Sequence, residues 1–343
     1  MNELPKLGVR AHGDLDPRSC IAIAEATEAH GFASLWFAEN PFQRGLMPAA
    51  SACAVMTRRL RIGLGIVNPY TRHPSLIAME FAALDELAEG RARLGIGSGI
   101  GAQIARLGLA WQPLAAMHDA IHIVRTLLAG EEVSYRGRVF SVDRAKLRFQ
   151  PASPQTPIYM AAMGDRSLAL CGEIADGLIV SNLCPPGYTA RAVGIVERAA
   201  AAAGRPSPRV VQYVPCVARP DRDAARRAAV VAIGETLAAL WPAGAEWPTL
   251  RETIVAESGI PRAEFVAALD RLRRGDPPQQ ALDDRFIDAF AIAGTAEECL
   301  ARAALYRRAG VAELVLTFGG SQPARDIAYL GGAVAEFAAA EVR

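Results

Sequence analysis

The sequence has almost no excess of charge: among 343 residues, 37 basic and 36 acidic side chains leave a net charge of +1. This balance gives no electrostatic field that would hold a nucleic-acid backbone or an anionic membrane surface, so neither is expected as a partner. No apolar run approaches the roughly 18 residues that a transmembrane helix needs, and the first residues do not resemble a signal peptide. We therefore expect a cytoplasmic protein whose partner is a small molecule.

Metal-binding and disulfide frameworks are lacking as well. The six cysteines are far apart and none shows C-x-x-C spacing, which indicates buried thiols in a reducing compartment. His118 and His122 are four residues apart on a helical stretch, but no third ligand is near in sequence, so a solvated helix face is expected there and no metal. Lysine is limited to Lys6 and Lys146, so an anion site would need arginine or backbone N–H groups.

Catalytic signatures that work without a cofactor are also missing. The chain contains no H-E-x-x-H, no G-x-S-x-G elbow and no Walker loop. With no metal, nucleophile or clear acid–base pair, an enzyme built on this chain would depend on an organic cofactor.

Short apolar runs alternate with amphipathic helical stretches along the whole chain. Each run is nearly continuous in apolar residues, as expected of a parallel strand covered on both faces. The eight candidate strands are Leu7–Arg10, Ser34–Ala38, Arg61–Ile66, Ala92–Ile96, Ile158–Ala161, Gly177–Val180, Val210–Val217 and Glu313–Thr317. This α/β pattern predicts a (β/α)8 TIM barrel, and an open doubly wound sheet is the alternative.

Two segments do not fit the simple alternation. Residues 131–150 predict a small hairpin that turns at Arg136–Gly137. Residues 220–290 are helical, interrupted by several prolines, and too long for an ordinary loop, so they predict a helical lid. We expect both to be insertions within a single domain that spans residues 1–343.

The loops that follow the strands are where a barrel builds its active site. After the third strand, residues 68–74 gather polar, aromatic and basic side chains, although a turn and a helix start would explain Asn68–Pro69 and His73–Pro74 equally. Gly63 and Gly65 indicate a backbone that bulges or closely approaches a flat ligand. Glu39 follows the second strand, where a carboxylate is costly unless it has a partner.

Two further loops offer backbone N–H groups. The run Gly95–Gly101 does not fit G-x-G-x-x-G, yet a glycine-rich loop before a helix still presents free N–H groups. After the fifth strand, Gly164 precedes a helix start that could hold a phosphate, with Arg166 supplying charge; an ordinary Asp cap is the alternative.

Taken together, these motifs resemble the luciferase-like oxidoreductase superfamily. The matching strings between residues 31 and 101 are G-F-x-S-L-W, N-P-Y-T-R-H-P, L-D-E-L-x-x-G-R and L-G-I-G-S-G, followed by A-A-M-G at 161–164 and G-E-I-A-D-G at 172–177. The 68–74 loop is most similar to the branch that uses the 5-deazaflavin coenzyme F420, typified by methylenetetrahydromethanopterin reductase. The resemblance fades through residues 220–290.

The resemblance implies a TIM barrel with its lid near the seventh strand and a bulge in the third strand. It places a non-prolyl cis peptide at Gly65–Ile66, which would back the central ring of the 8-hydroxy-5-deazaflavin, and it puts the phosphate-bearing tail at the Gly164 loop. We therefore predict that a larger side chain at Gly65 clashes with the bound ring. The cofactor-binding residues expected from it are Gly65, Ile66, Asn68, Gly97, Ser98, Gly99, Ala162, Met163, Gly164, Asp165 and Arg166.

The implied activity is hydride transfer between the deazaflavin C5 and a small organic substrate, with a methylene-tetrahydropterin or folate-like compound as the candidate. Glu39 and His73 are expected to make catalytic polar contacts and Tyr70 to stack or hydrogen-bond, while Arg44, Arg72 and Arg166 are candidates for anionic tails.

Three points stay open. Many F420-dependent members have an Asp–His pair after the second strand, and here Glu39–Asn40 stands instead; Asn cannot donate a proton as His can.

An FMN-dependent monooxygenase that works with a separate flavin reductase is the alternative function, and a non-catalytic ligand-binding barrel is a third. A homodimer through the outer helices is expected by analogy.

Overall fold

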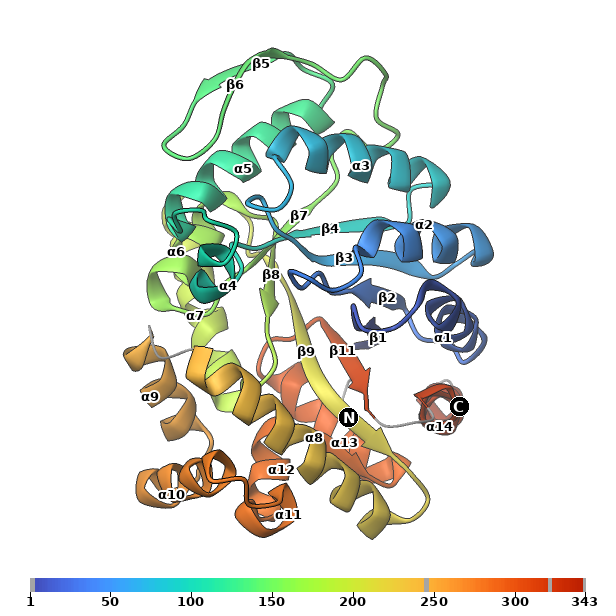
Figure 1. The fold of residues 1–343 in the computed structure, drawn as a ribbon. Coiled ribbons are helices and arrows are strands. Elements are labelled where there is room, and N and C mark those ends of the chain that lie inside the picture. The colour runs from blue at the N-terminus through green and yellow to red at the C-terminus, as the bar shows by residue number, and fades with distance from the viewer. Residues whose placement is uncertain (1–3, 244–246, 320–322, 342–343) are drawn as a thin grey trace.

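The computed structural model of the chain describes residues 4–243, 247–319 and 323–341, and its centre is a ring of parallel strands (Figure 1). The order β9-β11-β1-β2-β3-β4-β7-β8 is closed by pairing of β8 with β9, so the sheet is a barrel and not an open doubly wound sheet. The barrel strands are β1 (Lys6–Ala11), β2 (Ser34–Phe37), β3 (Arg61–Val67), β4 (Ala92–Ile96), β7 (Ile158–Ala161), β8 (Gly177–Val180), β9 (Arg209–Ala218) and β11 (Glu313–Phe318). Each corresponds to a predicted strand.

Both faces of the barrel strands are buried, which explains their continuous apolar runs. The interior is filled by large side chains, among them Trp36, Tyr159 and Tyr213, and the outer face packs under the helices. The helices that alternate with the strands are α1 (Pro17–Ala29), α2 (Leu46–Met56), α3 (Pro74–Leu87), α4 (Gly101–Ala105), α5 (Pro113–Leu128), α6 (Asp165–Ile174), α7 (Pro186–Ala202), α13 (Ala296–Arg308) and α14 (Pro323–Glu341).

Local sequence signals set the helix ends as expected. Pro74 is the first residue of α3, because its missing N–H would have no partner within the first turn anyway. Thr295 and Glu298 form a complete capping box at the start of α13, so each side chain satisfies a backbone N–H of the other.

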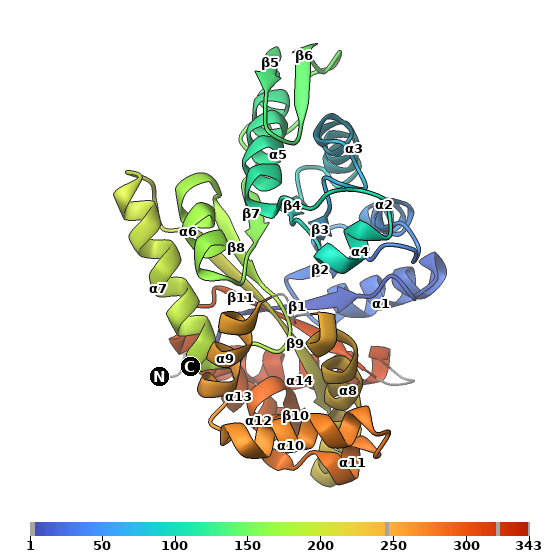
Figure 2. The same cartoon turned by 60° about the vertical axis from the view of Figure 1, so that its left-hand side comes forward.

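The hairpin predicted at residues 131–150 consists of β5 (Val133–Arg136) and β6 (Ser141–Ala145). It lies over α5, away from the barrel mouth (Figure 2). The buried carboxylate of Asp119 on α5 anchors it by accepting hydrogen bonds from the Tyr135 hydroxyl at 2.8 Å, Val139 N at 2.7 Å and Phe140 N at 3.1 Å. A single buried acceptor thus fixes both sides of the turn.

A second group of helices is inserted after β9, the seventh strand of the barrel. It comprises α8 (Arg222–Ala243), α9 (Pro248–Glu257), α10 (Arg262–Arg273), α11 (Pro278–Ala281) and α12 (Asp284–Phe290), and the short β10 (Ile292–Gly294) then pairs with β9. We call residues 222–290 the insertion. The boundaries agree with the segment 220–290 that the sequence set apart.

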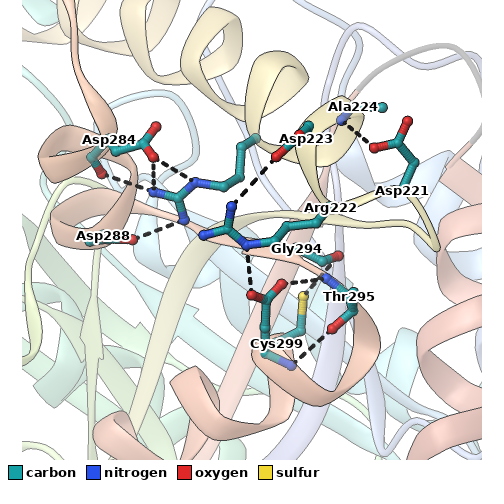
Figure 3. Close-up of polar contacts among 11 residues, drawn as sticks. Asp221, Arg222, Asp223, Ala224, Asp284, Asp288, Gly294, Thr295 and Cys299 are labelled. Atoms are coloured by element: carbon teal, nitrogen blue, oxygen red, sulfur yellow. Dashed lines mark hydrogen bonds and ion pairs between the residues drawn. The ribbon is translucent and has the colours of Figure 1, made fainter.

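Ion pairs hold the base of the insertion to the barrel and to itself (Figure 3). Arg222 on α8 donates to Glu298 on α13 at 2.7 Å, and Arg226 on α8 contacts Asp284 and Asp288 on α12, both at 3.1 Å. Further out, the aromatic rings of Trp241 and Phe265 pack with centroids 5.1 Å apart. These rings belong to the same apolar core as the outer face of the barrel, so the insertion packs as a continuation of it.

The cysteines are all buried free thiols, as the sequence predicted. Among the described residues, none of the helices is both long and apolar enough to cross a membrane.

Candidate functional site

A cavity of about 740 Å³ opens at the carboxyl ends of the barrel strands, between the barrel and the insertion. Its walls come from the loops after β2, β3, β4, β7 and β8, from Arg10 of β1 and Tyr213 of β9, and from α8 and α9 of the insertion. The loops lie at this end because parallel strands all finish on the same side of a barrel. This is the end at which the sequence placed the site.

Every cofactor-binding residue expected from the resemblance lines this one cavity. The set includes the third-strand bulge, the glycine loop after β4 and the loop before α6; its members are Gly65, Ile66, Asn68, Gly97, Ser98, Gly99, Ala162, Met163, Gly164, Asp165 and Arg166. Three segments that lie far apart in the sequence are thus brought to one surface.

The third-strand bulge is present where it was expected. The register of β3 against β4 shifts between Leu64 and Val67, and the Gly65–Ile66 peptide bond is cis. The reason for glycine at 65 differs from our expectation, however. A Cβ atom there would overlap the Tyr213 hydroxyl and approach the Trp36 ring to 2.8 Å, and both of these side chains belong to the packed interior of the barrel. A larger side chain at Gly65 would therefore clash with the barrel core before it met a ligand.

The loop after β4 is shaped by one buried amide. Asn68 is 3% exposed, and its Oδ1 accepts from Tyr70 N at 2.9 Å. Gly99 adopts φ +68°, and a Cβ on it would overlap the Asn68 side-chain amide, so only glycine fits. Because position 99 has no side chain, the loop lies directly against Asn68, and its backbone lines the cavity.

The loop before α6 is open to the cavity. Gly164 precedes α6 without a side-chain cap, and a Cβ on it would meet only Ser167 Oγ at 3.9 Å. The first N–H groups of a helix have no partner within the helix, so those of α6 can bind an anion. Asp165 is not the cap: its carboxylate makes two hydrogen bonds of 2.7 Å with Arg191, which also hold the pKa of Asp165 below its usual value.

Glu39 has the partner that its position demanded. Its carboxylate lies 2.7 Å from Arg72 Nη2 and is 9% exposed, and Arg72 also contacts Glu80 at 3.0 Å. Glu39 lines the cavity, whereas Arg72 stands behind it. Arg72 thus holds the Glu39 carboxylate in place and is not available to an anionic tail. Asn40 also lines the cavity, and its amide donates to Gln43 at 2.9 Å.

His73 and Tyr70 do not belong to the residues that line the cavity. His73 is exposed and caps α3 by accepting from Ser75 N at 3.2 Å, and the Tyr70 hydroxyl accepts from Gln112 N at 2.7 Å. Both rings contact Phe140 of the hairpin, with centroids 5.8 Å away. The structure therefore places these two predicted catalytic residues at the junction of helix and hairpin.

The structure also places three other residues that the sequence singled out, Arg44, His118 and His122. Arg44 is exposed outside the cavity and donates to the Asp14 carbonyl at 2.5 Å. His118 and His122 pack around Tyr135 of the hairpin, and no group of three possible metal ligands occurs among the described residues.

Several lining residues were not singled out from the sequence. Trp111 and Trp247 both line the cavity and contact each other with ring centroids 5.9 Å apart, and Trp111 Nε1 donates to Ser98 O at 3.1 Å. Arg251 lies over the Trp241 ring at 4.8 Å. Trp241 and Trp247 each precede a proline, and an aromatic residue beside a helix break was the available signal.

Arg10 and Asn182 were also missed, and each carries a buried polar atom without a partner. Arg10 Nε and Asn182 Oδ1 have no hydrogen-bond partner among the described residues, and both residues line the cavity. The signal for Arg10 was a cation in the apolar run Leu7–Ala11; Asn182 comes two residues after β8.

Comparison with known proteins gives the same picture. The chain is 30% identical to 5,10-methylenetetrahydromethanopterin reductase of Archaeoglobus fulgidus over 314 residues, which is 90% of this chain and 92% of that protein. Over 199 residues it is 33% identical to the F420-dependent glucose-6-phosphate dehydrogenase of Nakamurella multipartita, covering 54% and 58% of the two chains.

The solved coenzyme F420-dependent tetrahydromethanopterin reductase of Methanopyrus kandleri superposes with a TM-score of 0.84 at 25% identity, over 96% of this chain and 98% of that one. An FMN complex of the oxygenating constituent of 3,6-diketocamphane monooxygenase from Pseudomonas putida has a TM-score of 0.75 at 16% identity, over 97% and 98%, and so shares the fold. The profile of the luciferase-like monooxygenase family matches residues 4–313. On this match and the barrel that carries it, the chain belongs to the luciferase-like monooxygenase family.

Proposed function

We propose that this protein is an F420-dependent oxidoreductase that transfers a hydride between the deazaflavin and a small organic substrate. The observation that carries the proposal is the convergence of the eleven expected cofactor residues on one cavity. The relatives named above support the choice of F420, because those matched over most of the chain are methylenetetrahydromethanopterin reductases. A methylene-tetrahydropterin or folate-like compound is accordingly our candidate substrate.

The residues present fit such a cofactor. The backbone of Gly65–Ile66 forms a floor, Asn182 Oδ1 offers a buried acceptor without a donor, and the open Gly164 loop offers N–H groups to an anion. When bound, F420 would supply a carbon centre that gives or takes a hydride. The protein's part is then to position the two carbons and to exclude water.

Side chains around the cavity have distinct parts in this proposal. Glu39, fixed by Arg72, orients a polar group of the substrate. Asn40 donates to Gln43 and supplies no proton, so the reaction we propose is a hydride transfer without proton donation at that position. The insertion acts as a lid, and its Trp247 contacts Trp111 in the cavity wall.

A fluorescence titration of the purified protein with F420, FMN and NADPH tests the function. We expect F420 to bind at least ten times more tightly than the other two. Preferential binding of FMN, or oxygen uptake with reduced FMN, would favour the monooxygenase, and failure to bind any of them would favour a non-catalytic barrel. A homodimer stays a prediction, to be checked by light scattering.

The same titration locates the anionic tail. Gly164→Leu would fill the open space before α6 and block backbone approach, so we expect it to weaken F420 binding more than tenfold. Arg166→Ala removes one exposed charge and should cost about 1–2 kcal/mol, with a smaller effect at high salt. If Arg166→Ala is the more damaging change, the tail is bound by side-chain charge and not by the helix start.

A further inference from the structure

Arg10 is a cation at the edge of the cavity that has no anionic partner. It is the fifth residue of β1 and lines the cavity, and its Nε is shielded from solvent without a hydrogen bond. Among the described residues, its guanidinium makes no ion pair, and it lies over the face of the Tyr213 ring, 4.9 Å from the centroid.

The other ionisable groups in the cavity wall are accounted for differently. Glu39 is paired with Arg72 and Asp165 with Arg191. Arg251 lies over the Trp241 ring, and Arg166 is exposed. Both carboxylates are therefore already paired, and among the lining cations without an anionic partner Arg10 is the one with a guanidinium nitrogen that is shielded from solvent and has no acceptor among the described residues.

An unpaired buried charge is unfavourable, because the protein interior replaces the water that would solvate it. Burial accordingly lowers the pKa of Arg10, although a guanidinium stays charged at neutral pH. Desolvation also lowers the pKa of the neighbouring His12 to about 4, so His12 is neutral at pH 7 and adds no second positive charge. Among the residues that the structure describes, the positive charge beside the third-strand bulge is therefore that of Arg10 alone.

The position of Arg10 ties it to the reacting region. Its guanidinium rests on Tyr213, and the Tyr213 hydroxyl donates to Gly65 O at 3.3 Å in the third-strand bulge. The open loop before α6 follows β7, and four strand-to-strand steps along the barrel separate β7 from β1. An anion held by Arg10 is therefore near the bulge and remote from the tail site.

We propose that Arg10 binds a carboxylate of the substrate beside the third-strand bulge, so that the enzyme acts on carboxylate-bearing compounds. This inference rests on the proposed function for the identity of the reaction. A single guanidinium matches a carboxylate in charge and in planar, two-pronged geometry, whereas a phosphate dianion would keep an excess negative charge.

Binding assays with simple probes test the assignment. Calorimetric titrations with benzoate, its uncharged analogue benzamide and inorganic phosphate are made on the F420-loaded protein and on the apoprotein. The variants are Arg10→Met, Arg10→Lys and the matched control Arg166→Met, each also titrated with F420. We expect the wild-type protein to prefer benzoate over benzamide at least tenfold and to bind phosphate more weakly than benzoate.

Arg10→Met should reduce the benzoate preference to less than threefold while its F420 affinity stays within threefold of wild type, and Arg166→Met should keep the preference. Arg10→Lys preserves the charge and the fold but not the two-pronged guanidinium group, so it should retain a reduced preference for benzoate. Equal binding of benzoate and benzamide by wild type, or a preference that survives Arg10→Met, would overturn the assignment.

Two other outcomes identify a different anion. If Arg10→Met loses tenfold in F420 affinity and the wild-type protein shows no preference for benzoate, Arg10 binds the cofactor and not the substrate. If the wild-type protein binds phosphate more tightly than benzoate, the ligand of Arg10 is a phosphate and not a carboxylate. Each of these results overturns the proposal. If wild type does not bind F420 at all, the proposed function fails, while benzoate binding by the apoprotein still decides the role of Arg10.

Discussion

The two walls of the cavity are held together in different ways. The wall made by the strand-end loops, which we call the rim, is fixed by sheet register and by close contacts such as Gly65 against Tyr213. The insertion is fixed at its base by the ion pair of half-exposed Arg222 with Glu298, and by the packing of Trp241 and Phe265, which continues the apolar core of the barrel. One wall depends on backbone sterics, the other on surface charge and side-chain packing.

This difference has a functional consequence. At the rim, small changes of volume propagate into the barrel, because interiors are packed to crystal-like density. In the insertion, side chains such as Trp247 and Arg251 can change without moving a barrel strand. We infer that the rim suits a ligand that stays the same from one reaction to the next, and the insertion a ligand that varies. The expected cofactor residues lie on the rim, which agrees with this inference.

The largest effect is expected at Gly65 in the rim. Gly65→Ala should lower the free energy of unfolding by about 3 kcal/mol, because its Cβ would overlap the Tyr213 hydroxyl. Gly164→Ala is the matched control, since its Cβ enters open space, and it should change stability by less than about 1 kcal/mol. Denaturant unfolding of both variants checks this, and equal stabilities would show that the rim is as adaptable as the insertion.

The second-largest expected effect is a loss of stability at acid pH. The folded pKa of His12 is about 4 against an ordinary value of 6.5, so between these limits the unfolded chain binds a proton that the folded chain refuses. Stability should therefore be complete above pH 6.5 and fall by at most about 3 kcal/mol as the pH drops toward 4.

His12→Gln should flatten this decline, as measured by urea unfolding between pH 4 and 8. The variant and the wild-type protein should show parallel curves above pH 7. An unchanged slope below pH 6.5 in the variant would assign the acid sensitivity to groups outside the rim.

A moderate effect is expected for Trp247 in the insertion. Trp247→Ala removes one of the two rings that contact each other in the cavity wall, so substrate binding should weaken about tenfold, or about 1.4 kcal/mol. F420 affinity and the midpoint of thermal unfolding should stay close to wild type. A loss of F420 affinity equal to the loss of substrate affinity would contradict the division between the two walls.

The smallest effect is expected at the base of the insertion. Arg222→Met breaks a half-exposed ion pair with Glu298 and should cost less than about 1 kcal/mol, with no cost at high salt. Thermal unfolding at low and high salt measures it. A cost of several kcal/mol would mean that the insertion is held as rigidly as the rim.

Sequence reasoning went furthest where the signals were local. Strand periodicity follows from neighbouring residues, so each barrel strand corresponds to a predicted one, and a hairpin and a group of helices lie within residues 131–150 and 220–290. It failed where a residue's surroundings come from another part of the chain. His73 and Tyr70 looked catalytic in their own loop, but Phe140, almost seventy residues later, packs against both.

The sequence by itself determined the alternation of strands and helices and the loops that would carry a cofactor, because periodicity and glycine placement act over a few residues. Only the tertiary structure decided which charges are paired. Glu39 pairs with Arg72 and Asp165 with Arg191, whereas Arg10 lies over the Tyr213 ring of β9, two strands away in the barrel. The physical reason is that the free energy of burying a charge depends on its neighbours within a few ångströms. Those neighbours come from residues distant in sequence, which meet only when the barrel closes.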